Sequence, residues 1–128
     1  MKLLIDTHLL IWAAFGLPHL PKRASAAMKA ADSRLLFRAA SLWEIAIKQS
    51  LGRPDFDVDV AALRDGLLAN DYEELAVSSA HAVVVAALPP HHRDPFDRML
   101  VAQAQVGQAF LLTTDKQLTA YGAQVMAV

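Results

Sequence analysis

The chain alternates between short apolar runs and longer segments whose apolar residues recur every three or four positions. The continuous apolar runs predict strands at 2–6, 34–39, 72–77, 109–115 and 123–128. The segments with helical spacing, most of them bounded by proline or glycine, predict helices at 7–15, 21–32, 41–52, 59–71, 78–90, 95–106 and 116–122. Strands and helices therefore follow each other along the whole sequence.

Most of the predicted strands contain continuous apolar runs rather than apolar residues on one side only. Strands of this composition are buried on both faces, as in parallel sheets that carry helices on each side. The order of elements thus predicts an α/β sandwich with a parallel sheet. No repeat, linker or low-complexity segment interrupts the 128 residues, and we expect a single domain over 1–128.

The composition limits which kinds of metal site and nucleic-acid binding are possible. The chain has no cysteine, which excludes disulfides, thiolate metal sites and a cysteine nucleophile, so any metal must be held by oxygen or imidazole ligands. Twelve basic and thirteen acidic residues give a net charge of -1. Proteins that bind nucleic acid non-specifically are normally basic, so a nucleic-acid role here must depend on a local arrangement of charge.

The apolar fraction is 55%, whereas charged residues make up only 20%. This balance predicts exposed apolar surface and therefore a protein partner or self-association. The opening MKLLIDTHLLIWAAF has the lysine and apolar run of a signal peptide, but Asp6 and His8 interrupt the run and no small-residue cleavage site follows. No apolar stretch is long enough to span a bilayer. We expect a cytoplasmic protein without membrane contact.

Four acidic residues occupy related places in the predicted elements. Asp6 ends the first strand and Asp115 ends the fourth, while Glu44 opens the helix after the second strand and Asp97 opens the helix before the fourth. In open parallel sheets, functional groups gather beyond the carboxyl ends of the strands, where the strand order reverses. We expect the four carboxylates to converge at one edge of the sheet.

Each acid also has an explanation in local structure. The sequence SLWE at 41–44 fits a capping box in which Glu44 bonds back to the helix start. The sequence DPFD at 94–97 fits an N-cap, a proline and an acid in the first helical turn. Asp6 and Asp115 stand directly before predicted helices. Taken one at a time, capping and a functional role remain alternatives for these acids.

Their convergence favours a functional role. Crowded carboxylates raise one another's pKa and resist ionising together, and helix capping does not require them at the same end of the sheet. A divalent cation removes the conflict, because Mg²⁺ prefers oxygen ligands and is often held by one or two carboxylates together with phosphate oxygens. Such an ion activates water and neutralises charge on a phosphoryl group. The pattern therefore indicates metal-assisted phosphodiester hydrolysis.

Basic side chains adjoin these acids in the sequence. We consider them candidate RNA-binding residues: Lys48, His92, Arg93, Arg98 and Lys116. The alternative is ordinary surface chemistry, with Glu44 and Lys48 forming an i,i+4 pair and the others lying at solvated helix ends or in a loop.

Four stretches together resemble a known family. LLIDTHLLIWA, ASLWEIAIKQSLG, HRDPFDRMLVAQA and LLTTDKQL, in this order and at these separations, resemble the PIN-domain ribonucleases. The likeness is closest to the VapC-type toxins of type II toxin–antitoxin pairs, and it extends over essentially the whole chain.

The resemblance implies a three-layer α/β/α fold around a central parallel sheet. It also implies cleavage of RNA by an endonuclease that depends on Mg²⁺ or Mn²⁺, a homodimer, and inhibition by a cognate VapB-like antitoxin. The catalytic and metal-binding acids of the family fall on Asp6, Glu44, Asp97 and Asp115. Asp94 then caps the helix and neighbours the metal site.

The sequence departs from the family pattern at one position. Arg38 stands where relatives tend to have a small or apolar residue, so we expect the entry from strand to helix beside Glu44 to differ.

Two other functions fit parts of the pattern. A phosphoacceptor receiver-like domain shares the order of elements, but it needs an acceptor aspartate at the end of a central strand, and the acids at 55–59 lie in a polar loop. A phosphatase with an Asp-x-Asp pair is disfavoured because the second position is His8. A non-catalytic interaction module would keep the fold and a partner groove, although the presence of all four acids argues against it.

Overall fold

The computed structural model describes residues 1–16 and 18–128 of the chain. Within these residues the strands are β1 (Lys2–Ile5), β2 (Arg34–Arg38), β3 (Glu73–Leu75), β4 (Phe110–Thr113) and β5 (Val125–Ala127). The α-helices are α1 (Thr7–Ala14), α2 (Lys22–Lys29), α3 (Ala39–Ser50), α4 (Val60–Ala69), α5 (Ser79–Ala87) and α6 (Pro95–Val106). Two short 3₁₀ helices are η1 (Pro54–Phe56) and η2 (Lys116–Tyr121).

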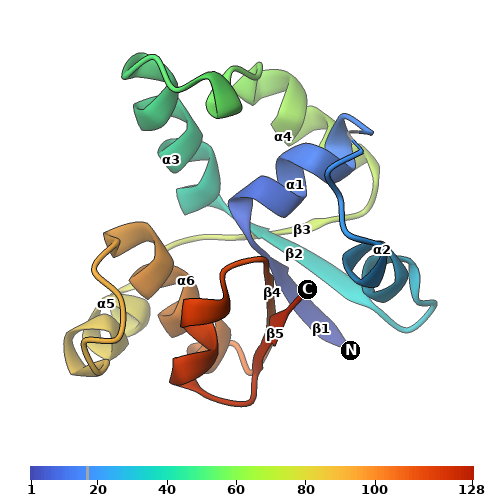
Figure 1. Ribbon diagram of the computed structural model, residues 1–128. Helices are drawn as coiled ribbons and strands as arrows, with labels where there is room; N and C mark the ends of the chain where they lie inside the picture. Colours follow the sequence, from blue (N-terminus) through green and yellow to red (C-terminus); the bar gives the residue numbers. More distant parts are fainter. Residues whose placement is uncertain (17) are drawn as a thin grey trace.

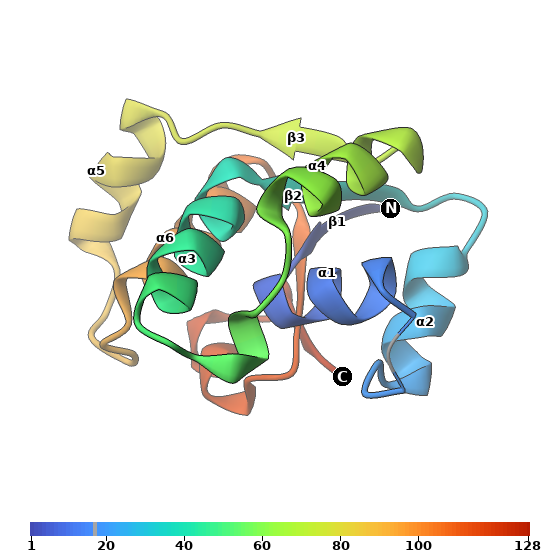
Figure 2. The same cartoon turned by 90° about the horizontal axis from the view of Figure 1, so that it is seen from above.

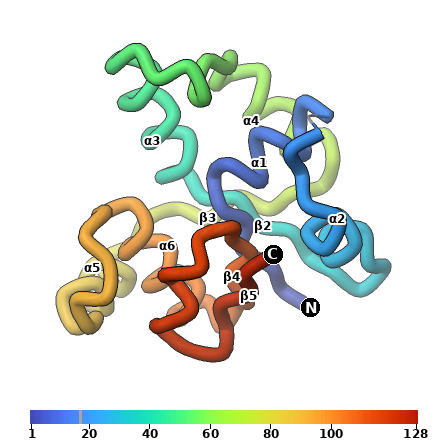
Figure 3. Tube along the Cα trace, viewed as in Figure 1, coloured from blue at the N-terminus to red at the C-terminus, as the bar shows by residue number. Residues whose placement is uncertain are grey.

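The strands form one parallel sheet in the order β3-β2-β1-β4-β5. Helices α1, α3 and α4 lie on one side of the sheet and α6 lies on the other (Figure 1). The chain builds these two layers in turn, since its blue-to-green first half supplies one and its yellow-to-red second half supplies the other (Figure 3). The α/β/α sandwich with a central parallel sheet is thereby confirmed.

The apolar strands stabilise both layers because successive side chains point to opposite faces. Leu3 and Ile5 of β1 belong to the core cluster beneath α1 to α4, whereas Leu4 belongs to the cluster that contains α6 and η2. All three are fully buried. Burying an aliphatic side chain of this size contributes about 1.5–3 kcal/mol, so β1 anchors both halves of the core.

The strand order reverses between β1 and β4. From β1 the chain proceeds outward to β2 and β3, and it then returns to add β4 and β5 on the other side. Ile5 pairs with Leu112, so Asp6 and Asp115 follow neighbouring strand ends at this switch point. The helices that follow β2 and precede β4, α3 and α6, lie at the same end of the sheet on opposite faces (Figures 1 and 2). Groups from all four elements are therefore available at one edge.

Several predicted boundaries change in the structure. The third strand is limited to Glu73–Leu75, and η1 forms in the segment expected to be a loop. Helix α3 begins at Ala39 with Arg38 as its N-cap residue, which places Ser41 inside the helix. The capping box predicted for 41–44 is therefore wrong. No helix among the described residues is long and apolar enough to cross a membrane.

Candidate metal centre

Asp6 combines a capping role with a place at the switch point. It is the N-cap residue of α1, and its Oδ1 accepts a hydrogen bond from the Thr7 backbone N–H at 2.6 Å. Its Oδ2 accepts a bond from the hydroxyl of Thr113 on β4 at 2.5 Å. The same hydroxyl oxygen accepts the backbone N–H of Asp115 at 3.1 Å. One threonine thus links the acids that follow β1 and β4.

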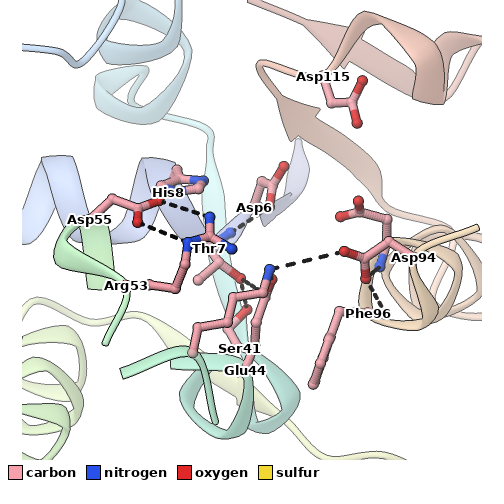
Figure 4. A network of polar contacts seen from close by, with 12 residues as sticks. Asp6, Thr7, His8, Ser41, Glu44, Arg53, Asp55, Asp94, Phe96 and Asp115 are labelled. Carbon is pink, nitrogen blue, oxygen red and sulfur yellow. Dashed lines mark hydrogen bonds and ion pairs between the residues drawn. The ribbon is translucent and has the colours of Figure 1, made fainter. Parts of the chain in front are cut away.

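Asp115 also combines both roles. It is the N-cap residue of η2, with Oδ1 accepting the Gln117 backbone N–H at 2.9 Å. Its Oδ2 lies 3.0 Å from Nε2 of His92, and the same nitrogen lies 3.4 Å from Oδ2 of Asp97. Asp6, Asp94 and Asp115 approach one region from three different elements (Figure 4).

His92, Asp97 and Asp115 lie close enough together to hold one ion, with their ligand atoms all within 4.8 Å of one another. The imidazole makes a further contact, because its Nδ1 accepts the Asp94 backbone N–H at 3.2 Å. An accepting Nδ1 assigns the ring proton to Nε2, which therefore donates to Asp115, while Asp97 Oδ2 is a longer electrostatic contact of the same nitrogen. Ligation through Nε2 would move that proton to Nδ1, where it would face the Asp94 N–H. His92 accordingly serves as a donor that orients Asp97 and Asp115.

Burial and neighbouring charge make two of the carboxylates resist ionisation. Burial, together with the charges of Asp6 and Asp94, raises the pKa of Asp97 to about 7, although electrostatic interaction with His92 opposes the rise. Burial also raises the pKa of Asp6, and its bond from Thr113 only partly offsets this. A nearby cation would therefore favour the ionised form of both carboxylates.

Glu44 is buried and both of its carboxylate oxygens are bound by neighbouring side chains. Oε1 accepts the hydroxyl of Thr7 at 2.7 Å, and Oε2 accepts Nζ of Lys48 at 2.6 Å. The Lys48 Nζ also lies 3.9 Å from Oδ2 of Asp94, the N-cap residue of α6. The predicted cap role of Asp94 is confirmed, since its Oδ1 accepts the Phe96 backbone N–H at 2.8 Å.

Arg38 is fully buried beside these acids. Its Nε donates to Ser41 Oγ at 3.0 Å, its Nη1 donates to the Phe96 carbonyl at 2.7 Å, and its Nη2 lies 3.5 Å from Glu44 Oε1. Burial lowers the pKa of Arg38, while the charge of Asp6 acts in the opposite direction, together with the charges of three further acids, Glu44, Asp94 and Asp97. The guanidinium is a built-in cation of the cluster. Two sequence signals pointed to this residue: an arginine at the end of an apolar strand, and a departure from the family pattern at that position.

The remaining basic candidates differ in their surroundings. Arg93 and Lys116 are exposed beside the cluster. Arg98 instead donates to the backbone carbonyls of Val85 and Pro89, each at 3.0 Å, and to two further acceptors, the Leu88 carbonyl and the Tyr121 hydroxyl. Through these hydrogen bonds, Arg98 of α6 holds the end of α5 against α6.

The donor set fits a hard divalent cation. Asp6, Asp97 and Asp115 offer carboxylate oxygens from three elements, and each oxygen that already accepts one hydrogen bond retains a second lone pair. Mg²⁺ and Mn²⁺ suit carboxylate and water ligands. Glu44 is less suited to direct ligation, because Lys48, Thr7 and Arg38 surround its oxygens.

Comparison with known proteins places this geometry in a family. The model of the PIN domain family matches residues 3–124. No curated protein sequence matches the chain. Among solved structures, similar folds occur in VapBC2 from Rickettsia felis bound to a DNA fragment from its promoter, with a TM-score of 0.70 and 12% identity over 100% of this chain and 98% of that chain. A toxin–antitoxin complex from Klebsiella pneumoniae has a TM-score of 0.63 and 17% identity, over 97% and 95% of the two chains. VapBC-1 from nontypeable Haemophilus influenzae has a TM-score of 0.60 and 17% identity, over 99% and 98%.

We predict that Arg38→Ala strongly destabilises the metal-free protein. Removing one partner of a buried ion pair costs about 3–5 kcal/mol, because the remaining charges lose their compensation. Denaturant unfolding in chelator measures the loss, and saturating Mg²⁺ or Mn²⁺ should restore part of it. The matched control is Arg34→Ala on the same strand, whose ion pair with Glu73 is exposed and should contribute under about 1 kcal/mol. Equal stability of Arg38→Ala and the parent in chelator contradicts the role of Arg38.

A second prediction concerns pH. The pKa of Asp97 is about 7 in the folded protein and near 3.8 ordinarily, so the folded state binds the proton more tightly than the unfolded state. Protonation of Asp97 therefore stabilises the folded state. This stabilisation is fully present below pH 3.8 and is lost as the pH rises through 7. The parent should therefore lose up to about 4 kcal/mol over this range in chelator relative to Asp97→Asn. Parallel unfolding free energies of the two proteins from pH 4 to pH 8 would refute it.

Proposed function

Because this chain belongs to the PIN-domain family, we propose that it is a metal-dependent endoribonuclease acting as the toxin of a toxin–antitoxin pair. The observation that carries the proposal is the convergence of Asp6, Asp97 and Asp115 at the switch point of the sheet, with raised pKa values for Asp6 and Asp97. Carboxylates held together against their mutual repulsion are the arrangement expected of a cation site.

In this proposal, Asp6, Asp97 and Asp115 bind Mg²⁺ or Mn²⁺. When bound, the ion supplies an activated water and neutralises charge on the phosphodiester. Glu44, which we also assign to the catalytic site, positions Lys48 and Arg38 around the cluster. Asp94 neighbours the metal site and, through its ion pair with Lys48, connects α6 to α3.

In this proposal, the basic side chains around the acids bind the RNA. Lys48 lies between Glu44 and Asp94, His92 donates into the cluster, and Arg93 and Lys116 are exposed next to it. We leave Arg98 out of the RNA-binding set because backbone carbonyls already accept its donors. The local cations would allow a chain of net charge -1 to bind a polyanion.

We further propose that an antitoxin covers an apolar surface between α3 and α6, and that the protein forms a homodimer. The three structural neighbours described above are toxin–antitoxin or VapBC structures by their own descriptions. Trp43 of α3 is 63% exposed and packs edge-on against Phe96 of α6 with ring centroids 5.3 Å apart. A groove of about 310 Å³ at this place is lined by apolar side chains that include Ile47 and Met99. An exposed aromatic beside the acids is a suitable anchor for a protein tail.

Because the chain belongs to the PIN-domain family, we no longer consider the receiver-like alternative. A non-catalytic interaction module of the same family remains the second candidate, and cleavage assays separate it from a nuclease.

Asp6→Asn and Asp97→Asn should each lower the rate of RNA cleavage at least about a hundredfold, because each removes one charged ligand of the ion. Single-turnover cleavage of labelled RNA in Mg²⁺ measures the effect, and circular dichroism checks that the variants fold. Asp65→Asn, at an exposed position of α4, is the matched control and should cleave like the parent. Parent-like rates in both variants would remove these residues from the site.

Chelation should abolish RNA cleavage reversibly. The raised pKa values of Asp6 and Asp97 mean that a cation binds more readily as the pH rises, since protons compete for the same oxygens. Activity restored by Mn²⁺ or Mg²⁺ after chelator treatment should therefore need less metal at pH 8 than at pH 6. Cleavage that persists in excess chelator contradicts a metal-dependent nuclease.

Trp43→Ala should weaken antitoxin binding by about tenfold or more while RNA cleavage stays unchanged, since a buried aromatic anchor contributes about 2 kcal/mol or more to an interface. Titration of the purified cognate antitoxin gives the affinity. The control is Leu51→Ala, an exposed apolar position at the end of the same helix. Unchanged antitoxin affinity would place the antitoxin elsewhere.

A further inference from the structure

Four aromatic rings form a continuous row beside the acid cluster. Phe56 of η1 lies 4.9 Å from His8 between ring centroids, His8 lies 5.6 Å from Trp12, and Trp12 lies 5.6 Å from His19. His8 and Trp12 are four residues apart on α1 and therefore share one face of the helix. The Trp12 and His19 rings are stacked, with 28° between their planes.

The row leads from the core to the surface. Phe56 is fully buried, His8 and Trp12 are half-buried, and His19 is exposed. His8, Trp12 and His19 form one wall of a groove of about 350 Å³, and Pro54, Asp57 and Val58 line its other side. We call this the aromatic groove. Its walls come from two segments far apart in the sequence, so its width is fixed by the fold.

The aromatic groove begins next to the proposed metal centre. His8 lies two residues after Asp6, and Thr7 between them donates to Glu44. Two cations flank the buried end of the row, with Lys48 Nζ 5.0 Å and the Arg53 guanidinium carbon 5.4 Å from the Phe56 ring centroid. His8, Arg53 and Asp55 meet at this point (Figure 4). A phosphate at the acid cluster would thus have its neighbouring nucleotide at the mouth of the groove.

The acids of the groove indicate which part of a nucleotide enters it. Asp55 lies 3.1 Å from His8 Nε2 and forms an ion pair with Arg53, whose Nε is 3.4 Å away. Asp57, which also lines the groove, is exposed. Carboxylates repel phosphate, but they accept hydrogen bonds from the amino groups of bases, as in the pairing of Asp or Glu with cytosine N4. Aromatic rings, in turn, stack with any base.

We propose that the aromatic groove binds an unstacked base of single-stranded RNA next to the cleaved phosphodiester, and that it prefers adenine or cytosine to uracil. The inference rests on the proposed ribonuclease function and adds to it the part of the substrate that is recognised. Recognition of RNA through splayed-out bases that stack on aromatic side chains is common where single strands are bound.

Trp12 reports on this site directly. The chain has two tryptophans, Trp12 and Trp43, so Trp43→Phe leaves the indole of the groove as the sole tryptophan fluorophore. In the Asp6→Asn, Trp43→Phe protein, which should not cleave its ligand, oligo(A) and oligo(C) should quench Trp12 emission. Oligo(U) should quench it only at concentrations about tenfold higher or more, because it lacks the amino donor.

Variants test the same groove by affinity. In the Asp6→Asn protein, Trp12→Ala should weaken oligo(A) binding about tenfold to a hundredfold, and Trp12→Phe should retain much of the affinity because a ring remains. Asp57→Asn should reduce the preference for oligo(C) over oligo(U). Trp43→Ala is the matched control and should leave the oligonucleotide affinity unchanged, since Trp43 lies outside the groove.

The outcomes separate this inference from the proposed function. If the parent cleaves RNA while all three oligonucleotides leave Trp12 emission unchanged, the aromatic groove does not bind bases, and the nuclease assignment stands. Equal quenching by oligo(A), oligo(C) and oligo(U) refutes the base preference. If oligo(A) and oligo(C) quench Trp12 but the parent cleaves no RNA in Mg²⁺ or Mn²⁺, the groove is supported and the nuclease assignment is wrong.

Discussion

Electrostatic repulsion among carboxylates at one edge of the sheet is the constraint to which the rest of the molecule is adapted. The fold opposes it with groups of its own: Arg38 is buried among the acids, Lys48 binds Glu44, and His92 donates to Asp115 and lies 3.4 Å from Asp97. The pKa of Asp97 nevertheless stays raised, first by burial and then by the charges of Asp6 and Asp94. Negative charge that is left partly uncompensated at one place favours a cation there.

The sequence predicted the positions of the acids well because two physical requirements coincide at the carboxyl ends of parallel strands. A helix that starts beyond a strand needs an N-cap, and a functional group at the sheet edge needs the same position. Asp6 and Asp115 each cap a helix and lie at this edge of the sheet, so capping leaves them available for the proposed site. Capping and function were therefore never exclusive alternatives for these residues.

The sequence predicted less where a side chain's role depends on distant partners. The sequence marks Arg38 only as a departure from the family pattern and Arg98 only as a candidate RNA-binding residue. In the structure Arg38 binds the Phe96 carbonyl, 58 positions away, and Arg98 binds carbonyls at the end of α5. The prediction of a capping box at 41–44 is wrong because α3 starts at Ala39. The Ser41 hydroxyl bonds to the side chains of Thr7 and Arg38 instead of capping a backbone N–H. Contacts of this kind arise from the packing of β2 and α3 against α1 and α6, which no local pattern encodes.

The division of the chain between two layers has a consequence for synthesis. Asp6 and Glu44 come from the half that builds one face of the sheet, whereas Asp97 and Asp115 come from the half that builds the other. A nascent chain that has left the ribosome only as far as α4 can bury much of its first core, but it holds half of the acids. The cluster of four acids is therefore completed only when β4 pairs with β1, which connects Asp115 to Asp6 through the hydroxyl of Thr113.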